Sequence, residues 1–485
     1  MNVSPDEIQS IVRQVLEKIH EGNRPEPETS TRVTTAQPCT SPSISEFWAG
    51  QDGVFGDIDV CVAEAGKAFE TLRGLSLSTR RAMISNMRAR ALANLESLSI
   101  HAVSETGMGR VADKVKKNRL ATVKTPGMED LESRVVSGDD GLTLMERAPW
   151  GVLTAVTPCT NPSETVICNS IGMVAAGNAV VFNPHPRAKR VTQATVSLLN
   201  RAIVEAGGPA NLLTAPLDPS QDTTLRSMNH PDVRMVVVTG GGEIVKAAFR
   251  SGKKAITAGP GNPPVVVDET ADLKHAARCI VDGAGLDNTV LCIAEKEIIA
   301  VERIADELLE RLKEAGAYHV IGSAVARLEK LIFPEPGHLN RDLFGRDVQV
   351  ILSRIGLDVP ESFRVALIET PKDHPLVFQE QMMPVLPFVR VKDVNEAIDL
   401  AYAAEKGCGH TAVMHSKNLD HLHRMATRMN TAIFVKNGPS YAGLGEGGEG
   451  HTSFSIAHPT GEGLTTARHF TREIRCTLKG YFRIV

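Results

Sequence analysis

Short apolar runs alternate with longer amphipathic segments in the middle of the chain, between residues 151 and 268. The apolar runs have the length of buried strands, and they are Val152–Thr157, Ala179–Asn183, Leu212–Thr214, Val233–Thr239 and Pro264–Val267. Helices are expected between them, over Ser163–Ala176, Ala188–Ala206 and Glu243–Arg250. This order predicts an α/β fold, with a doubly wound parallel sheet and a site at the carboxyl ends of its strands.

The alternation continues from residue 269 to residue 460 and predicts a second α/β domain. Its expected strands are Ile298–Val301, Arg364–Ile368, Leu386–Val391, Thr411–His415 and Ala432–Val435. The segment 438–463, rich in glycine and serine, is expected to form a surface loop that lines the substrate mouth. Ahead of both domains the pattern is helical, with amphipathic helices over Asp57–Leu72 and Ser78–Glu105. The turn residues Gly138–Gly141 lie between alternating flanks and predict a hairpin.

The first twenty residues predict a separate amphipathic helix. Ser4 and Glu7 form a capping box, and apolar residues then recur on one face. Residues 21–43, rich in Pro, Thr and Ser, predict a disordered linker. Because a tethered helix cannot bury its apolar face locally, it needs a partner surface. The alternative is a helix that folds back on the rest of the chain or on a sister subunit.

Composition narrows the class of protein. The 485 residues are 42% hydrophobic and 23% charged, and a net charge of -4 with 4% aromatics disfavours nucleic acid as a partner. No apolar run approaches the length of a membrane span. The eight cysteines include no CxxC pair and predict reduced thiols in a cytosolic protein. The basic segment 107–127 predicts a solvated helix face, with contact to cofactor phosphates as the weaker alternative.

Cys292 is the candidate nucleophile. It lies between a helix-like segment, Ala271–Gly285, and the expected strand Ile298–Val301, so a turn holds it between two rigid elements. A thiol attacks a carbonyl as the thiolate, which needs nearby amide dipoles or cations. The alternative is a small apolar core residue. No histidine lies in a context typical of a general base, which disfavours a thiolase-like acyltransferase.

Two other turns carry candidate binding groups. The turn Thr157–Pro162 ends the first expected strand, and the Asn161 amide there can donate to a carbonyl oxygen together with the Cys292 backbone N–H. Thr160 stays open as the alternative donor. The turn Thr239–Glu243 contains Gly240 and Gly241, which let the backbone approach a pyrophosphate at a helix N-terminus. A plain strand-to-helix turn is the alternative.

The run Asn288–Lys296, with its Cys-Ile-Ala-Glu-Lys, resembles the nucleophile segment of the CoA-acylating branch of the aldehyde dehydrogenase superfamily. The resemblance extends from about Ser45 to the end of the chain, and is strongest to the propionaldehyde or acetaldehyde type found in bacterial microcompartments. It implies binding of NAD and coenzyme A, without a metal, by Thr157, Asn183, His185, Thr239, Gly240, Gly241, Gly259 and Glu380. Glu380 matches the carboxylate that binds the nicotinamide ribose. Since the Lys and Glu of the usual adenine-ribose run are absent around Asn183, a preference for NAD over NADP stays open.

Gly259 is the most informative departure from the hydrolytic members. Those members carry at this place a Glu that activates the water for thioester hydrolysis. Without a positioned base, water is a poor nucleophile toward a thioester. The missing side chain is also expected to leave room for a larger acceptor. We therefore expect transfer of the acyl group to CoA.

These expectations combine into an NAD-dependent, CoA-acylating aldehyde dehydrogenase acting on propanal or acetaldehyde. The expected parts are an encapsulation-type helix (1–20), a linker (21–43), a Rossmann-type NAD and CoA domain (44–130 and 150–267), an oligomerisation arm (131–149 and 469–485) and a catalytic domain (268–468). Expected partners are a sister subunit and a shell protein that binds residues 1–20, which places the protein in the cytoplasm, inside a microcompartment. The alternatives are a hydrolytic aldehyde dehydrogenase and a catalytically degenerate shell-associated binding protein.

Overall fold

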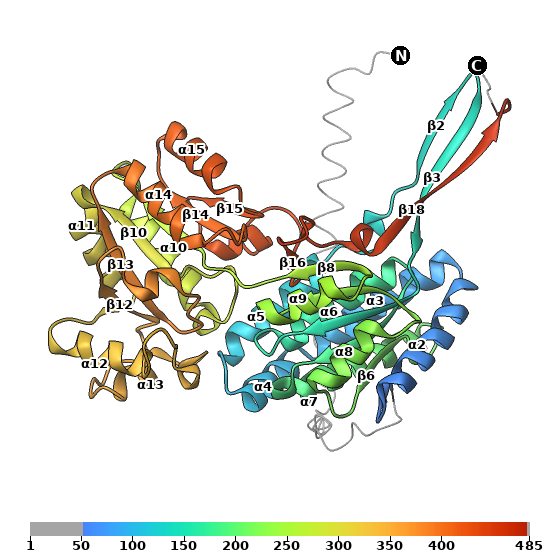
Figure 1. The fold of residues 1–485 in the computed structure, drawn as a ribbon, viewed down its shortest axis with the longest axis horizontal. Coiled ribbons are helices and arrows are strands. Elements are labelled where there is room, and N and C mark those ends of the chain that lie inside the picture. Colours follow the sequence, from blue (N-terminus) through green and yellow to red (C-terminus); the bar gives the residue numbers. More distant parts are fainter. Residues whose placement is uncertain (1–51, 483–485) are drawn as a thin grey trace, which may run out of the picture. The chain divides into compact units, whose positions relative to one another are not determined.

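A parallel sheet of six strands forms the first half of the fold in the computed structural model, which describes residues 52–482 (Figure 1). Its order is β1 (Val54–Phe55), β6 (Leu213–Pro216), β5 (Ala179–Pro184), β4 (Val152–Thr157), β7 (Val233–Thr239) and β8 (Lys254–Ala258). The order reverses between β4 and β7, where two adjacent carboxyl ends open a crevice for ligands. The predicted helix 1–20 and linker 21–43 lie outside the described residues.

Eight helices among residues 52–250 accompany this sheet. They are α2 (Ile58–Arg73), α3 (Leu77–Ala93), α4 (Leu95–Thr106), α5 (Val111–Lys124), α6 (Pro162–Ala175), α7 (Lys189–Glu205), α8 (Gln221–Asn229) and α9 (Gly242–Arg250). The single helix predicted over residues 78–105 is wrong, because Asn94 leaves helical geometry between α3 and α4. Its side-chain amide donates to the Arg90 carbonyl oxygen at 2.8 Å, a local bond that competes with the backbone ladder.

A second parallel sheet of seven strands carries the rest of the chain. Its order is β11 (Ala317–His319), β12 (Val365–Glu369), β13 (Val385–Val391), β10 (Glu297–Val301), β9 (Pro264–Val267), β14 (Thr411–His415) and β15 (Ile433–Lys436). Its helices are α10 (Leu273–Gly285), α11 (Glu302–Glu314), α12 (Ser323–Ile332), α13 (Val348–Ser353), α14 (Val394–Glu405) and α15 (Leu419–Met429). The predicted second α/β domain is thus present, and one hydrophobic cluster contains side chains of both sheets, such as Ala155 and Val265.

The predicted hairpin is present as β2 (Arg134–Gly138) and β3 (Gly141–Pro149), joined by the expected turn. The C-terminal strand β18 (Thr471–Lys479) pairs antiparallel with β3 along its whole length, as expected. Figure 1 shows these three strands extending away from the two parallel sheets. Every residue of β2 is exposed, and so is all of β18 except Thr471.

The elements that the sequence did not predict include the short strands β1 and β11, the strand β8 and the helix α8. The strand β8 begins with the exposed Lys254 at the edge of the first sheet, so it lacks the apolar run of a buried strand. The segment 438–463, predicted as a loop, contains the short helix η7 (Ser440–Leu444) and the two-residue strand β16 (Ile456–Ala457), which pairs with β17 (Gly463–Leu464).

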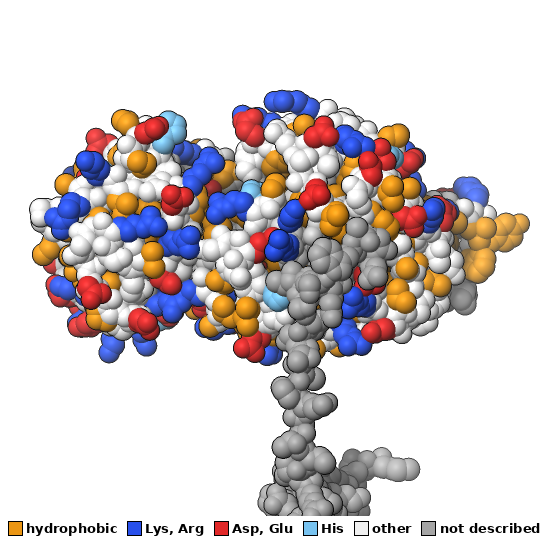
Figure 2. All heavy atoms as spheres, turned by 90° about the horizontal axis from the view of Figure 1, so that it is seen from below, with side chains coloured by type: hydrophobic (Ala, Val, Ile, Leu, Met, Phe, Trp, Pro, Cys, Tyr) orange, Lys and Arg blue, Asp and Glu red, His pale blue; other side chains and the backbone are white. Residues whose placement is uncertain are grey.

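Residues 52–482 contain no helix that is both long and apolar enough to cross a membrane. Within the same residues, no group of three or more His, Cys, Asp or Glu side chains is arranged to hold a metal ion. On the face drawn in Figure 2, Lys and Arg side chains are interspersed with Asp and Glu, as the small net charge suggests.

Candidate active site

Cys292 lies in the turn between α10 and β10, as predicted, and its side chain is half-buried. The Ala294 N–H closes this turn on the Leu291 carbonyl oxygen at 3.2 Å. At the end of the turn the Lys296 N–H donates to the Pro263 carbonyl oxygen at 3.0 Å. The nucleophile therefore lies at the amino end of β10, beside the start of β9.

Three residues in a row ahead of Cys292 have left-handed backbone geometry. Asp287, Asn288 and Thr289 have φ angles of 52°, 55° and 67°. Each such residue costs about 1–2 kcal/mol, and a β-branched threonine adopts this region rarely. The surroundings hold the strain, since the Asn288 amide donates to the Gly345 carbonyl oxygen at 2.9 Å and the Thr289 hydroxyl to the Ala284 carbonyl oxygen at 2.7 Å.

Segments that lead into four neighbouring strands gather around this turn. Glu380 precedes β13, Cys292 precedes β10, Gly261 precedes β9 and His410 precedes β14. The Gly261 N–H donates to Glu380 Oε1 at 3.3 Å. A Cβ atom on Gly261 would lie 2.7 Å from the Cys292 carbonyl oxygen and 2.9 Å from the His410 ring, so these groups are adjacent. One edge of the second sheet thus brings together residues far apart in sequence.

The surroundings of the thiol oppose its ionisation. Burial raises the pKa of Cys292 to about 12, the charge of Glu380 adds to the rise, and Lys296 and Lys117 oppose it. Lys296 is fully buried, and its ammonium donates to the carbonyl oxygens of Thr289 and Leu291 at 3.1 and 3.2 Å. In the sequence, Lys296 was noted only as the last residue of the Cys-Ile-Ala-Glu-Lys motif. Because a resting thiol is a weak nucleophile, the site needs a group that removes its proton.

His410 is the candidate for this group, because its ring lies beside the Cys292 backbone. It is fully buried, its Nδ1 lies 2.8 Å from Thr411 Oγ1, and its Nε2 has no hydrogen-bond partner among the described residues. Burial, with His458 and Lys296 nearby, lowers the pKa of His410 well below its usual range, so the ring is neutral at pH 7. The sequence predicted no histidine in a general-base context, and a base role for His410 is a prediction from the structure. The residue is distant from Cys292 in the chain, and its one signal was its place directly before an expected strand.

Side chains occupy the space beside Gly259 that we expected to be open. A Cβ on Gly259 would lie 3.4 Å from ring atoms of His458 and 3.4 Å from Pro459. The Gly259 N–H donates to His458 Nε2 at 3.2 Å, and His458 Nδ1 is hydrogen-bonded to the Cys408 carbonyl oxygen. His458 also lies 4.6 Å from His410 between ring centroids. The expectation of open space is therefore wrong, and a histidine with both nitrogens engaged occupies it.

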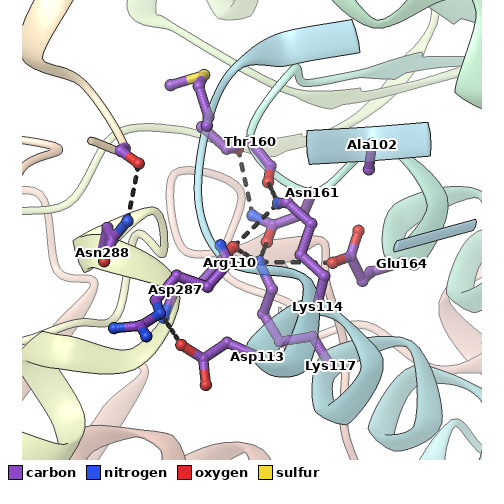
Figure 3. A network of polar contacts seen from close by, with 12 residues as sticks. Ala102, Arg110, Asp113, Lys114, Lys117, Thr160, Asn161, Glu164, Asp287 and Asn288 are labelled. Carbon is purple, nitrogen blue, oxygen red and sulfur yellow. Dashed lines mark hydrogen bonds and ion pairs between the residues drawn. The ribbon is translucent and has the colours of Figure 1, made fainter. Parts of the chain in front are cut away.

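Asn161 is buried at the N-terminus of α6, after the end of β4 (Figure 3). Its Oδ1 accepts from the Lys117 ammonium at 2.6 Å, and its Nδ2 donates to Thr160 Oγ1 at 3.2 Å. Thr157 is buried at the end of β4, with a hydroxyl that has no partner among the described residues. This geometry favours the Asn161 amide over Thr160 as the oxyanion donor, and the assignment stays a prediction.

The basic segment 107–127 is not simply a solvated face. Lys114 and Lys117 on α5 are at most 2% exposed, and both ammonium groups pair with Asp287 in the nucleophile turn. Figure 3 shows this network between α5, the Asn161 turn and Asp287. Ion pairing explains the burial, because an unpaired buried ammonium is too costly to keep charged. Charge counts along the sequence do not reveal that partner.

The glycine turn joins β7 to α9 next to the switch between β4 and β7. The Thr239 hydroxyl lies 2.7 Å from Ser455 Oγ, and the Gly240 N–H donates to the Ala258 carbonyl oxygen. Gly241 caps α9 without a side-chain bond, and a Cβ there would meet nothing within 4 Å. An open helix N-terminus suits a dinucleotide phosphate, so these residues fit the expected cofactor contact.

Asn183 and His185 receive less support as cofactor contacts. Asn183 is buried, and its Nδ2 donates to Thr154 Oγ1 at 2.7 Å and lies 3.3 Å from Ser227 Oγ. His185 is half-buried and accepts from the Arg187 N–H at 3.1 Å, a turn-stabilising role. Their contact with a nucleotide stays a prediction, although the buried Oδ1 of Asn183 has no hydrogen-bond partner among the described residues.

A cavity of about 220 Å³ adjoins the nucleophile turn. Its apolar lining comes from both halves of the fold, namely Leu120, Val281, Leu286, Leu291, Tyr441, Leu444 and Phe454. Lys117, Asp113, Asp282, Arg364 and Glu446 are among its polar lining. Three of the apolar residues belong to the segment 438–463, which was expected to line the substrate mouth.

Comparison with known proteins identifies the family to which a chain with this site belongs. The model of the aldehyde dehydrogenase family matches residues 26–329. Acetaldehyde dehydrogenase (acetylating) EutE of Salmonella typhimurium is 48% identical over 439 residues, which cover 89% of this chain and 94% of that protein. A Rhodopseudomonas palustris propionaldehyde dehydrogenase, solved with bound CoA and an acylated cysteine, is 50% identical with a TM-score of 0.87, over 89% of this chain and 99% of that chain.

A third similar protein is a propionaldehyde dehydrogenase from the Clostridium phytofermentans fucose utilisation bacterial microcompartment. It is 45% identical with a TM-score of 0.88, over 90% of this chain and all of that chain. Structures of two variants of it are known, one with a cysteine and one with a histidine replaced by alanine. Along the sequence, these two positions are separated by the same number of residues as Cys292 and His410 in this chain. With a family model that matches more than half of its length and relatives this similar, the chain belongs to the aldehyde dehydrogenase family.

Proposed function

We propose that this protein oxidises a short aldehyde with NAD and transfers the acyl group from Cys292 to CoA. It is an oxidoreductase of the CoA-acylating branch, in line with its acetylating and propionaldehyde-specific relatives. The observation that carries the proposal is the space beside Gly259, which holds the His458 ring in place of a carboxylate. Both ring nitrogens are hydrogen-bonded, so His458 is not free to replace the glutamate that activates water in hydrolytic members, which favours a thiol as the acceptor.

Catalysis begins when the Cys292 thiolate attacks the aldehyde carbon. The carbonyl oxygen becomes an oxyanion, to which the Asn161 amide and the Cys292 backbone N–H donate. NAD, held at the α9 N-terminus by the turn with Gly240 and Gly241, would supply the hydride acceptor for oxidation of the thiohemiacetal to the thioester. The thioester left on Cys292 then passes its acyl group to the CoA sulfur, which restores the free thiol. Two separate half-reactions on one nucleophile predict ping-pong kinetics.

His410 is the proposed proton acceptor. Its ring adjoins the Cys292 backbone, and its Nε2 is unpartnered among the described residues. A neutral imidazole takes the proton from the Cys292 thiol before attack, and from the CoA thiol before acyl transfer. Glu380 also lies close to Cys292, since its charge raises the pKa of that thiol. A carboxylate there accepts hydrogen bonds from ribose hydroxyls, the role expected from the sequence.

The cavity is the proposed binding site for the alkyl group of the aldehyde. Its apolar lining includes Leu291, the residue directly before Cys292, and Phe454. Propanal is the first substrate we propose and acetaldehyde the second. The preference is small, because one missing methylene in an apolar pocket is worth only about 1–3 kcal/mol.

The sheet β2–β3–β18 supports assembly with further copies of this chain. It exposes apolar side chains on its strands, namely Val135, Val136, Ile474 and Leu478. A three-stranded sheet with exposed apolar residues gains stability when a second copy covers it. Location in the cytoplasm, inside a microcompartment, with residues 1–20 docked on a shell protein, is proposed from the sequence and from the microcompartment origin of one relative.

An absorbance assay for NADH tests the reaction. Purified protein, propanal and NAD are mixed with and without CoA, and the protein is then analysed by mass spectrometry. We expect continuous NADH formation only with CoA, and a propionyl adduct on Cys292 without it. Sustained NADH formation without CoA would show a hydrolytic enzyme. No NADH under any condition would favour a shell-associated binding protein on an inactive enzyme fold.

A glutamate restored at position 259 tests the acceptor step. Because His458 occupies the space, Gly259→Glu is combined with His458→Ala, and each single variant serves as its control. We expect the double variant to raise the share of turnover that needs no CoA, since the carboxylate can then activate water. An unchanged share in a folded double variant would contradict our account of deacylation.

A further inference from the structure

Two lysines of α5 reach across the fold into the active site. The side chains of Lys114 and Lys117 are 0% and 2% exposed, although the segment reads as basic and solvated. Both pair with Asp287, which is fully buried in the strained turn ahead of Cys292 (Figure 3). Lys114 also donates to the Thr160 carbonyl oxygen at 3.0 Å. A helix of the first sheet is thereby linked to the nucleophile turn of the second.

Lys117 bonds both parts of the oxyanion site. Its ammonium donates to Asn161 Oδ1 at 2.6 Å and to Asp287 Oδ2, and it lies 3.4 Å from Glu164 Oε1. An ammonium group has only donors, so it must face the oxygen of the Asn161 amide. The NH₂ group is then directed away from Lys117. One of its hydrogens goes to Thr160 Oγ1, and the other has no protein acceptor among the described residues.

The Lys117 ammonium also pairs with Asp287, which belongs to the turn that carries the Cys292 backbone N–H. Asp287 accepts from the Arg110 N–H at 2.7 Å as well, and its own N–H donates to Asp113 Oδ2 at 3.0 Å. A Cβ on Gly109 would lie 2.0 Å from Asp287 Oδ1, so the carboxylate has no room to move. Despite burial, the charges of Asp287 and then Glu164 raise the pKa of Lys117, which keeps it charged.

We infer that Lys117 is a positioning residue, which sets the orientation of the Asn161 amide and its position relative to the Cys292 N–H. It acts through Asn161 and Asp287, and its charge also favours the Cys292 thiolate, but no described contact joins it to a reacting atom. This inference rests on the proposed function, because it concerns the oxyanion formed at Cys292. Loss of the ammonium lets the amide rotate and present its oxygen to the oxyanion, which removes one donor.

The test compares two reactions of Cys292 that need no NAD. Acylation by p-nitrophenyl acetate transfers an acetyl group to sulfur, releases p-nitrophenolate and passes through an oxyanion. Alkylation by iodoacetamide displaces iodide and forms no oxyanion. Their rate ratio therefore reports the oxyanion site separately from the thiol itself, and a residue that only supports the fold leaves it unchanged.

The main variant is Lys117→Met with Glu164→Gln. The second change restores charge balance around Asp287, because removing the lysine alone leaves a buried carboxylate without its partner. We expect the ratio, and kcat with propanal, NAD and CoA, to fall at least about tenfold, with the KM for propanal little changed. Arg119→Met, an exposed residue of the same helix, is the matched control and should match the wild type.

A cycle with Asn161→Ala decides whether Lys117 acts through Asn161. We expect the Lys117 and Glu164 changes to add little in the Asn161→Ala background, since the amide they orient is already absent. A double variant with the melting temperature and the ratio of the wild type would overturn the inference, as would full additivity in the cycle. Wild-type protein that forms no NADH with propanal and CoA would overturn the proposed function, and the inference with it.

Discussion

The two parallel sheets serve the site from opposite ends. The first sheet contributes residues that follow its strands, at the carboxyl ends of β4 and β7, where α6 and α9 begin. The second sheet contributes residues that precede its strands, at the amino ends of β13, β10, β9 and β14. Helix N-termini supply the first edge with free N–H groups for anions. The second edge has turns leading into strands, so its charges come from side chains such as Lys296 and Glu380.

This difference suggests a division of labour. The rule for open α/β sheets places ligands at carboxyl ends, and the first sheet follows it with an open α9 N-terminus suited to a cofactor phosphate. The second sheet departs from the rule and holds the nucleophile, its neighbouring lysine and a neutral histidine. Changes at the α9 N-terminus are therefore expected to affect the KM for NAD, and changes at Cys292 or at the Asn161 donor are expected to affect kcat.

Cys292→Ala should have the largest effect, because the second edge then loses its nucleophile. We expect NADH formation from propanal to fall at least about 10⁴-fold, to the limit of detection. Circular dichroism and the melting temperature should stay close to those of the wild type. Cys476→Ala removes an exposed thiol on β18 and should keep full activity. Normal activity of Cys292→Ala would show that the second edge takes no part in catalysis.

Asn161→Ala should follow, since it removes the donor that the first edge extends toward the thiol. Loss of one oxyanion donor costs about 10²–10³-fold in kcat. The KM for NAD should change little, because the α9 N-terminus is untouched. Steady-state kinetics with propanal measure both constants. Equal losses in kcat for Asn161→Ala and Thr160→Ala would reopen the choice between the two donors.

Gly241→Asp should weaken cofactor binding without affecting the thiol. The position is open, so the fold accepts a side chain, but the carboxylate caps α9 and repels a phosphate. We expect the KM for NAD to rise about tenfold, which corresponds to about 1.4 kcal/mol, while iodoacetamide alkylates Cys292 at the wild-type rate. Gly56→Asp adds the same charge at an open position elsewhere and should leave the KM unchanged.

Glu380→Gln should have the smallest effect, which is a change in the pH dependence of Cys292 alkylation. The negative charge of Glu380 adds to the burial that raises the pKa of Cys292 to about 12. Its removal lowers the pKa of the thiol, so the thiolate fraction at pH 8 increases and alkylation speeds up. A rate profile with iodoacetamide from pH 7 to pH 10 should move to lower pH. Glu361→Gln changes an exposed carboxylate and should leave the profile in place.

Sequence patterns were most reliable where a segment is buried on both faces. The predicted bounds of Val152–Thr157, Val233–Thr239, Pro264–Val267 and Thr411–His415 are those observed. Apolar runs report such strands directly, because both faces exclude water. Weaker signals failed, as at the edge strand β8 and at the break in the helix around Asn94. The burial of Lys114 and Lys117 was missed for a similar reason, since their partner Asp287 is distant in the chain.

The sequence by itself determined the order of strands and helices, the turn that holds Cys292 and the family resemblance, because periodicity and short motifs are local properties. Only the tertiary structure decided which distant groups meet that thiol. It brought His410 beside the Cys292 backbone, put His458 into the space beside Gly259, and joined Asn161 to the nucleophile turn through Lys117. Parallel pairing of strands far apart in the chain fixes these contacts, and no short stretch of sequence records it.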